Sequence, residues 1–173
     1  LSFKYIEPAL YEEIVGKLKD TQRQRTRFIN KFSFPIINSL NNAGIDYEIK
    51  GRTKSVYSIA RKMKAQGVPF EEVYDIFAIR IITNSKMDNE KSDCWKAYSI
   101  VTDHYVPNPG RFRDWVSKPK SNGYESLHTT VMSEGGKWVE VQIRTSRMDE
   151  IAEKGLAAHW KYKESGKGEA AES

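Results

Sequence analysis

Three polar side chains recur at every second residue of a segment that has the composition of a β-strand. Residues 137–145 alternate between apolar and polar types, and successive side chains of a strand point to opposite faces of the sheet. The apolar ones are expected to face the core, and the other face should carry Glu140, Gln142 and Arg144. An acid, an amide and a guanidinium in a row can supply a metal ligand or base, an orienting group and an anion clamp. An ordinary strand with a solvent-facing polar side is the alternative.

A second carboxylate, Asp75, lies in a segment rich in isoleucine, phenylalanine and alanine, residues 73–82. This composition predicts a strand buried on both faces. Since burying a carboxylate without a partner is costly, Asp75 should pair with Arg80 or with a metal ion such as Mg²⁺, which prefers carboxylate and phosphate oxygens. An exposed or salt-bridged Asp75 without further function is the alternative.

A basic segment, residues 50–63, combines a turn with the start of a predicted helix. Ser58 and Lys62 would lie one turn apart on one helix face, with Lys54 just before the first turn. The N-terminus of a helix attracts anions, and Arg52 can stack on a base or contact a phosphate in bidentate fashion. The layout suits a polyphosphate, although the Walker pattern is absent. An amphipathic helix with a solvated basic face is the alternative.

A long cationic loop, residues 111–126, precedes another predicted strand. Tyr124 can stack on a base, and Lys120 can contact a phosphate. His128 follows at the start of the strand, beside these candidates. A plain connecting loop followed by a structural histidine is the alternative.

Composition limits the class of protein. The 173 residues suffice for one domain, 39% of them are hydrophobic, and the net charge is +5. No apolar run approaches the roughly 20 residues of a membrane-spanning helix, and no secretory signal is recognisable. A single cysteine, Cys94, favours a reducing compartment. We expect a soluble, cytoplasmic domain without membrane contact and, because the initiator methionine is missing, a fragment of a longer protein.

Periodicity predicts the elements that position these residues. Helical spacing of apolar residues predicts a helix over residues 3–43 that is broken or restarted at Pro35. The further helices are predicted between Ser55 and Gly67, over 91–105 and over 148–162. Strands are predicted over 45–49, 73–82, 127–132 and 137–145. The expected organisation is a helical segment (1–43) packed on a mixed α/β core (44–163), followed by a disordered tail (164–173).

Five segments, in order along the chain, resemble the synthetase domain of the RelA/SpoT family, whose members make guanosine tetra- and pentaphosphate. They are Gly51–Ile59, Tyr74–Arg80, Lys120–Thr129, Glu140–Thr145 and Ala157–Trp160. The resemblance implies an α/β (α+β) fold in which a nucleotidyltransferase-like mixed sheet is flanked by helices. It also implies Mg²⁺-dependent transfer of the β,γ-pyrophosphate of ATP to the 3′-hydroxyl of GTP or GDP, with release of AMP.

The resemblance further implies a role for each candidate residue. ATP would be held by Arg52, Lys54, Ser58 and Lys62, with Arg52 beside the adenine. Mg²⁺ would be bound by Asp75 and Glu140, and Glu140 would be the base for the 3′-hydroxyl. Tyr124 would stack on guanine. The acceptor and its phosphates would be positioned by Lys120, Asn122, His128, Gln142 and Arg144.

One segment departs from the family pattern. Arg111–Asp114 resembles the basic R-x-K-D motif associated with GDP or GTP preference, but Arg113 replaces the lysine and is not geometrically equivalent to it. The basic type accompanies bifunctional enzymes, whose hydrolase motif is missing from this sequence, and contact with a ribosome or tRNA would need domains absent here. The remaining alternatives are a guanine-nucleotide sensor without catalysis and an RNA-binding domain.

Overall fold

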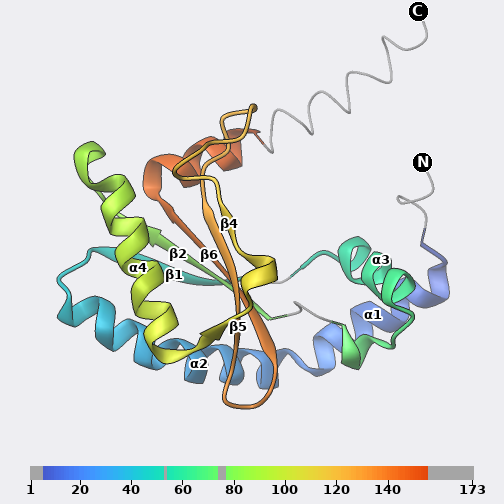
Figure 1. Ribbon diagram of the computed structural model, residues 1–173. Coiled ribbons are helices and arrows are strands. Elements are labelled where there is room, and N and C mark those ends of the chain that lie inside the picture. Colours follow the sequence, from blue (N-terminus) through green and yellow to red (C-terminus); the bar gives the residue numbers. More distant parts are fainter. Residues whose placement is uncertain (1–5, 53, 74–76, 156–173) are drawn as a thin grey trace, which may run out of the picture.

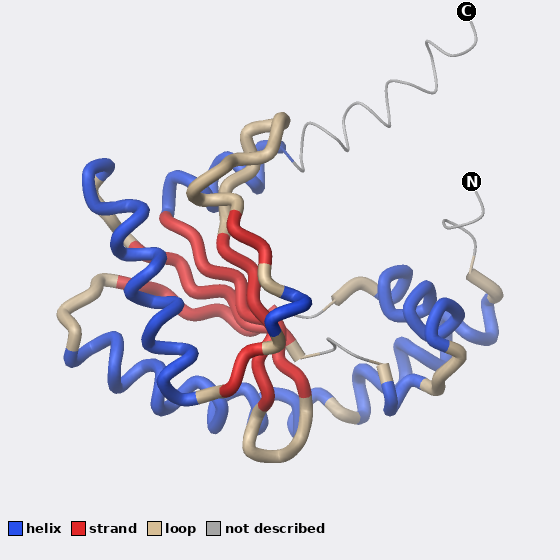
Figure 2. The backbone as a smooth tube through the Cα atoms, viewed as in Figure 1, coloured by secondary structure: helices blue, strands red, loops and turns tan. Residues whose placement is uncertain are grey.

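The computed structural model describes residues 6–52, 54–73 and 77–155, and a mixed β-sheet lies at its centre (Figures 1 and 2). The strand order is β1-β2-β6-β5-β3, and β4 pairs with β5 beside β3. Strands β2 and β6 are parallel, and the other pairs are antiparallel. The strands span Tyr47–Arg52 (β1), Ala78–Thr83 (β2), Val106–Pro107 (β3), Arg113–Asp114 (β4), Leu127–Met132 (β5) and Trp138–Thr145 (β6).

Two helices, α2 (Gln22–Asn42) and α4 (Glu90–His104), cover one face of this sheet. Side chains of a strand point alternately to its two faces, and in β2 and β6 the odd-numbered residues point toward these helices. Their apolar side chains are buried against both helices, in a core that includes Ile79, Ile81, Val141, Ile143, Phe32, Ile36, Cys94 and Val101. The predicted core side of the 137–145 strand is therefore confirmed.

A second, smaller core joins α1 (Pro8–Asp20), α3 (Val56–Gln66) and the 3₁₀ turn η2 (Phe70–Glu72). It contains Ile14 of α1, Ile59 and Ala60 of α3, Phe70 and Val73. Figure 1 shows α1 and α3 side by side, away from α4. The basic helix predicted to start near Ser55 thus belongs to a body separate from the main sheet core.

The ends of α3 follow from its sequence. The Ser55 hydroxyl accepts a hydrogen bond from the backbone N–H of Ser58 (3.1 Å), which caps the first turn. Gly67 ends the helix with φ of +63°, a conformation that glycine adopts at little cost. The cap at Ser55 makes α3 begin at Val56, only a few residues after β1 ends at Arg52.

The predicted break at Pro35 is wrong, because Pro35 lies inside α2. The missing N–H of a proline removes one helical bond, but Phe32, Ile36 and Leu40 on the same helix are buried and hold it in place. The chain changes direction at Thr21 instead, between α1 and α2. There Arg25 donates to the carbonyl oxygen of Leu18 (2.7 Å), which the end of α1 leaves without a helical partner.

The other boundaries differ by a few residues from prediction. The strand expected over 73–82 begins at Ala78, and residues 70–72 form η2. Residues 146–155 are helical, but the rest of the helix predicted over 148–162, the tail 164–173 and Asp75 lie outside the described residues. Within the described ranges, no helix is both long and apolar enough to cross a bilayer.

Candidate functional site

The sheet face opposite α2 and α4 carries rows of polar side chains. Residues directly opposite each other in a ladder share a face. The register aligns one residue from each of five strands in a single row: Lys50, Arg80, Gln142, His128 and Arg113. The next row consists of Arg52, Ala78, Glu140 and Thr130. Sequence segments that are far apart thus meet on one polar face.

Glu140 is held from both sides by nitrogen donors. Its Oε2 lies 2.8 Å from the ammonium of Lys54, and its Oε1 accepts from the amide of Gln142 at 3.0 Å. Burial acts to raise the pKa of Glu140, but these two partners outweigh it and lower the pKa to about 2. Glu140 is therefore a carboxylate at neutral pH, as both predicted roles, metal ligand and base, require.

Two polar atoms in the first row are buried without a hydrogen-bond partner in the described part of the chain. They are Nε of Arg80, a donor, and Oε1 of Gln142, an acceptor, on neighbouring strands. Most buried polar atoms in proteins are hydrogen-bonded, so an unpaired donor and acceptor here are groups that a ligand can satisfy. The polar face is thus suited to binding.

Arg144 is buried rather than solvent-facing, with 2% of its surface exposed. Asp149, on the helix that follows β6, neutralises it, since its Oδ1 accepts from Nε (2.9 Å) and lies 2.7 Å from Nη2. The same Oδ1 lies 3.2 Å from Nη1 of Arg80, which also contacts Glu153. The solvent-facing alternative for this strand is therefore wrong. Asp149 was not among the residues predicted from the sequence.

An aromatic cluster surrounds Tyr124 at the end of the cationic loop. The Tyr124 hydroxyl lies 2.7 Å from Nε2 of His128 and 3.2 Å from Nη1 of Arg144. The indole of Trp115 packs edge-on against both rings, and the ammonium of Lys120 lies 4.0 Å from the Trp115 ring centroid. Trp115 was also missed, although its position within the predicted loop was the available signal.

Burial and neighbouring charges set the protonation state of His128. A guanidinium can only donate, so the Tyr124 oxygen accepts from Arg144, and the same hydroxyl lies within hydrogen-bond distance of Nε2 of His128. Burial and the nearby charges of Arg144, Arg52 and Lys120 lower the pKa of His128 to about 4, despite the opposing effect of Glu140. His128 is therefore a neutral imidazole at pH 7.

The remaining predicted residues are placed as follows. The Asn122 side chain accepts from the backbone N–H of Tyr124 (3.0 Å) and so shapes the turn before the aromatic ring. Arg113 is exposed and donates to the carbonyl oxygen of Phe112 (2.8 Å), within its own loop. Ser58 and Lys62 are half-buried on α3. Arg113 thus contacts the backbone of its own loop. The other residues that the structure brings together are Lys54, Glu140, Gln142, Arg144, Tyr124 and His128.

The described residues contain no cluster of three or more metal-ligating side chains. Glu140 nevertheless fits one ligand position of the predicted Mg²⁺ site, since its carboxylate is ionised and lies beside cations suited to phosphates. The ammonium of Lys54 contacts Oε2, so a cation bound at this oxygen would share the carboxylate with Lys54.

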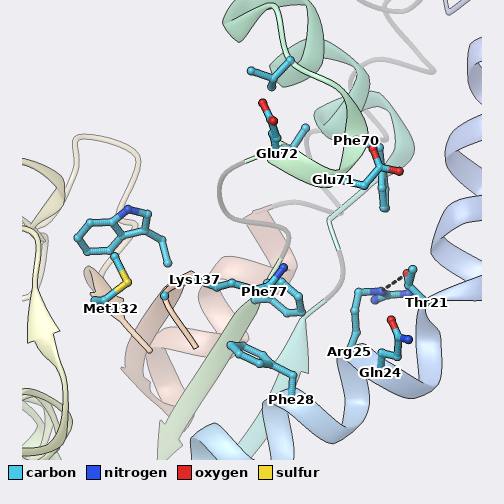
Figure 3. Close-up of a pocket in the computed structure, with 14 residues that line it drawn as sticks. Thr21, Gln24, Arg25, Phe28, Phe70, Glu71, Glu72, Phe77, Met132 and Lys137 are labelled. Carbon is cyan, nitrogen blue, oxygen red and sulfur yellow. Dashed lines mark hydrogen bonds between the residues drawn. The ribbon is translucent and has the colours of Figure 1, made fainter. Parts of the chain in front are cut away.

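A cavity of about 840 Å³ lies at the hairpin end of the sheet, between α2, η2 and the β5–β6 turn (Figure 3). Phe28, Phe77 and Lys137 meet there, with the two ring centroids 4.4 Å apart and the ammonium 5.3 Å from the Phe77 ring. The cavity adjoins the Glu140 row, because the backbone N–H of Glu140 donates to the Phe77 oxygen (3.1 Å). No spacing in the sequence indicated it.

Solved structures share this architecture. Small alarmone synthetase 2 from Bacillus subtilis is 27% identical and aligns with a TM-score of 0.62 over 86% of this chain and 81% of that one. Small alarmone synthetase 1 from the same organism shows the same fold at 22% identity, with a TM-score of 0.61 over 88% and 81%. The predicted fold class, a mixed sheet flanked by helices, is confirmed.

Sequence comparison identifies the family. The family model described as the region found in RelA / SpoT proteins matches residues 51–167, more than half of the chain, which therefore belongs to the RelA/SpoT family. A guanosine-3′,5′-bis(diphosphate) 3′-pyrophosphohydrolase of Spiroplasma citri is 44% identical over 165 residues, and a GTP pyrophosphokinase of Myxococcus xanthus is 43% identical over 164. In both cases 95% of this chain aligns with 21% of the relative, so the chain spans about a fifth of their length.

Proposed function

We propose that this domain makes guanosine tetra- and pentaphosphate by transferring the β,γ-pyrophosphate of ATP to the 3′-hydroxyl of GDP or GTP. The observation that carries the proposal is the polar sheet face, where an ionised Glu140 and the cation Lys54 lie one row from the aromatic cluster of Tyr124. The family supports it, since the Myxococcus relative is named a GTP pyrophosphokinase. The hydrolase name of the Spiroplasma relative belongs to a protein about five times as long.

The donor side of the site would bind the triphosphate of ATP. Lys54 precedes the N-terminus of α3, where backbone N–H groups and the helix dipole favour anions. Lys62 and Ser58 follow on that helix, and Arg52 ends β1 with its side chain exposed for stacking on adenine. Since phosphoryl transfer needs mainly positioning and charge neutralisation, these residues provide what the reaction demands of the donor side.

Asp75 and Glu140 would hold Mg²⁺, which when bound neutralises phosphate charge and orients the transferred group. In the reaction, the 3′-oxygen of the acceptor forms a bond to the β-phosphorus of ATP. The bond from that phosphorus to the α,β-bridging oxygen breaks, and AMP leaves with the oxygen. The hydroxyl proton goes to Glu140. While Lys54 holds it, Glu140 has a pKa of about 2 and is a weak base, so this role requires Lys54 to turn toward phosphate.

The acceptor would lie on the Tyr124 side of the sheet. Guanine would stack on the Tyr124 ring, and the Lys120 ammonium, now over the Trp115 ring, would move to a phosphate. Gln142 offers its amide oxygen, which accepts from no described residue, to the acceptor. His128, Asn122 and Arg144 keep Tyr124 in place. Exposed Arg113 can reach the acceptor phosphates only by leaving its contact with Phe112. We place this reaction in the cytoplasm, which the single Cys94 favours.

The test is direct synthesis. The chain is mixed with Mg²⁺, ATP labelled in its β-phosphate, and GDP or GTP in parallel, and the products are separated by anion-exchange chromatography. We expect labelled guanosine tetra- or pentaphosphate with an equal amount of AMP. Glu140→Gln and Asp75→Asn should abolish the product. The exposed acid of the β5–β6 turn provides the matched control, Glu134→Gln, which should leave it unchanged.

Three results would overturn the proposal in part or in full. Synthesis that persists in Glu140→Gln or Asp75→Asn would remove the role assigned to that carboxylate. A folded protein that binds nucleotides without any transfer would instead be a sensor. Tyr124→Ala should weaken GDP binding far more than ATP binding, and equal losses would remove the stacking assignment.

A further inference from the structure

Asp149 begins a chain of contacts that ends at the Tyr124 ring. One edge of the Arg144 guanidinium, Nε and Nη2, lies 2.9 and 2.7 Å from Oδ1 of Asp149. The remaining nitrogen, Nη1, donates to the Tyr124 hydroxyl at 3.2 Å, and this hydroxyl in turn lies 2.7 Å from His128. Because the guanidinium is a rigid plane, the position of the carboxylate fixes the direction in which Nη1 points.

We propose that Asp149 is a positioning residue, which orients Arg144 so that the Tyr124 ring is held ready for the guanine base. This rests on the proposed function, in which Tyr124 stacks on the acceptor. Asp149 lies on the helix after β6, whereas Tyr124 lies in the loop before β5. The contact chain therefore ties the acceptor loop to that helix across the end of the sheet.

Burial explains why this orientation depends on a carboxylate. Arg144 has only 3% of its side chain exposed, and Asp149 only 19%, so water competes weakly for their contact. A free arginine side chain has many rotamers, and selecting one of them has an entropic cost. If Arg144 became ordered only when guanine binds, this entropic cost would weaken guanine binding. Asp149 orders Arg144 already in the folded protein without ligand.

The same helix provides a matched control, because Glu153 lies one turn after Asp149. Both carboxylates lie 3.2 Å from Nη1 of Arg80. Of these two carboxylates, only Asp149 is in contact with Arg144, and the side chain of Glu153 is 58% exposed. Comparing Asp149→Asn with Glu153→Gln therefore separates the effect through Arg144 from a general effect of removing a charge near Arg80.

The experiment measures GDP affinity by calorimetry, without turnover, and the KM values for GDP and ATP during synthesis. We expect Asp149→Asn to weaken GDP binding about tenfold, the usual effect of losing a hydrogen bond to a charged group, and to change the KM for ATP less than twofold. Glu153→Gln should leave both unchanged. Equal losses for GDP and ATP, or equal effects of the two variants, would overturn the proposal.

A double-mutant cycle tests the path of the effect. Tyr124→Phe keeps the ring but removes the hydroxyl that Arg144 contacts, so Asp149→Asn should cost nothing further in that background. An unchanged tenfold loss would show that Asp149 acts elsewhere and would overturn the inference.

Arg144→Lys keeps the charge without the planar fork, so it serves as a second variant should Asp149→Asn not fold. A wild-type chain that binds no GDP would overturn both the proposed function and this inference. Wild-type GDP binding with an unaffected Asp149→Asn variant would overturn the inference alone.

Discussion

The ion pair between Lys54 and Glu140 allows a quantitative prediction for Lys54→Met. This change leaves a mostly buried carboxylate without its ammonium partner, since the two side chains are 13% and 16% exposed. In the folded protein, the pKa of Glu140 lies at about 2, against an ordinary value of 4.5. At about 1.4 kcal/mol per pKa unit, this shift corresponds to about 3 kcal/mol of stability at pH 7. Removing one partner of a buried pair has a similar cost, about 3–5 kcal/mol.

The sign of the pH dependence follows from the lowered pKa. A carboxylate with a depressed folded-state pKa stabilises the fold above its unfolded-state pKa, and this stabilisation is lost as the pH falls through the folded-state value. The wild-type advantage over Lys54→Met should therefore shrink from about 3 kcal/mol at pH 7 to about 1 kcal/mol at pH 3. Urea denaturation followed by tryptophan fluorescence, in buffer with a chelator, measures this difference.

Lys50→Met is the matched control. Lys50 lies on the same sheet face, but it is 53% exposed and lies 3.7 Å from Glu48. Exposed pairs of this kind contribute about 0–1 kcal/mol, so this variant should lose little stability, with little dependence on pH. Adding Glu140→Gln should also remove most of the effect of Lys54→Met. Equal, pH-independent losses in both lysine variants would refute the reasoning, because the pair would then contribute nothing in solution.

Three further predictions concern single residues. Ser55→Ala should reduce the free energy of unfolding by about 1 kcal/mol by removing the cap of α3, and an unchanged value in urea denaturation would contradict that cap. His128 has a pKa of about 4 against an ordinary 6.5, so the unfolded chain takes up its proton first. The free energy of unfolding should therefore decrease as the pH falls from 6.5 to 4. The imidazole NMR signals of His128 should then stay constant from pH 7 to 5, and a midpoint near 6.5 would contradict the buried position. Cys94, whose pKa is raised to about 12 by burial and by Glu90 and Asp93, should resist thiol reagents at pH 8 until denaturant is added, so rapid labelling of the folded protein would contradict this.

The sequence predicted the elements with strong periodicity and the face on which the polar residues lie. Alternation along residues 137–145 was sufficient to place Glu140, Gln142 and Arg144 on one side of β6. The break expected at Pro35 was wrong because a local rule was outweighed by the burial of the neighbouring residues of α2. Packing against a sheet depends on residues far away in the chain, and a local pattern does not contain it.

The partners within the site could not be predicted from spacing. Lys54 and Glu140 are separated by 86 positions, and only the register of β1, β2 and β6 brings them together. Asp149 has no motif of its own, and its contact with Arg144 depends on where the helix after β6 lies relative to that strand. The charged residues could therefore be named from the sequence, but the carboxylate that each cation binds could not.

The separation of the two hydrophobic cores has a consequence for hydrogen exchange. Ile14, Ile59 and Phe70 pack α1 against α3 in a cluster that shares no buried residue with the larger core of the sheet. The smaller cluster buries less apolar surface, so its amides should exchange through a partial opening that leaves β2 and β6 protected. In that open form Glu140 keeps its place while the basic N-terminus of α3 is lost. Under the proposed function ATP would contact the N-terminus of α3, so it should slow exchange in α3 more than in the sheet.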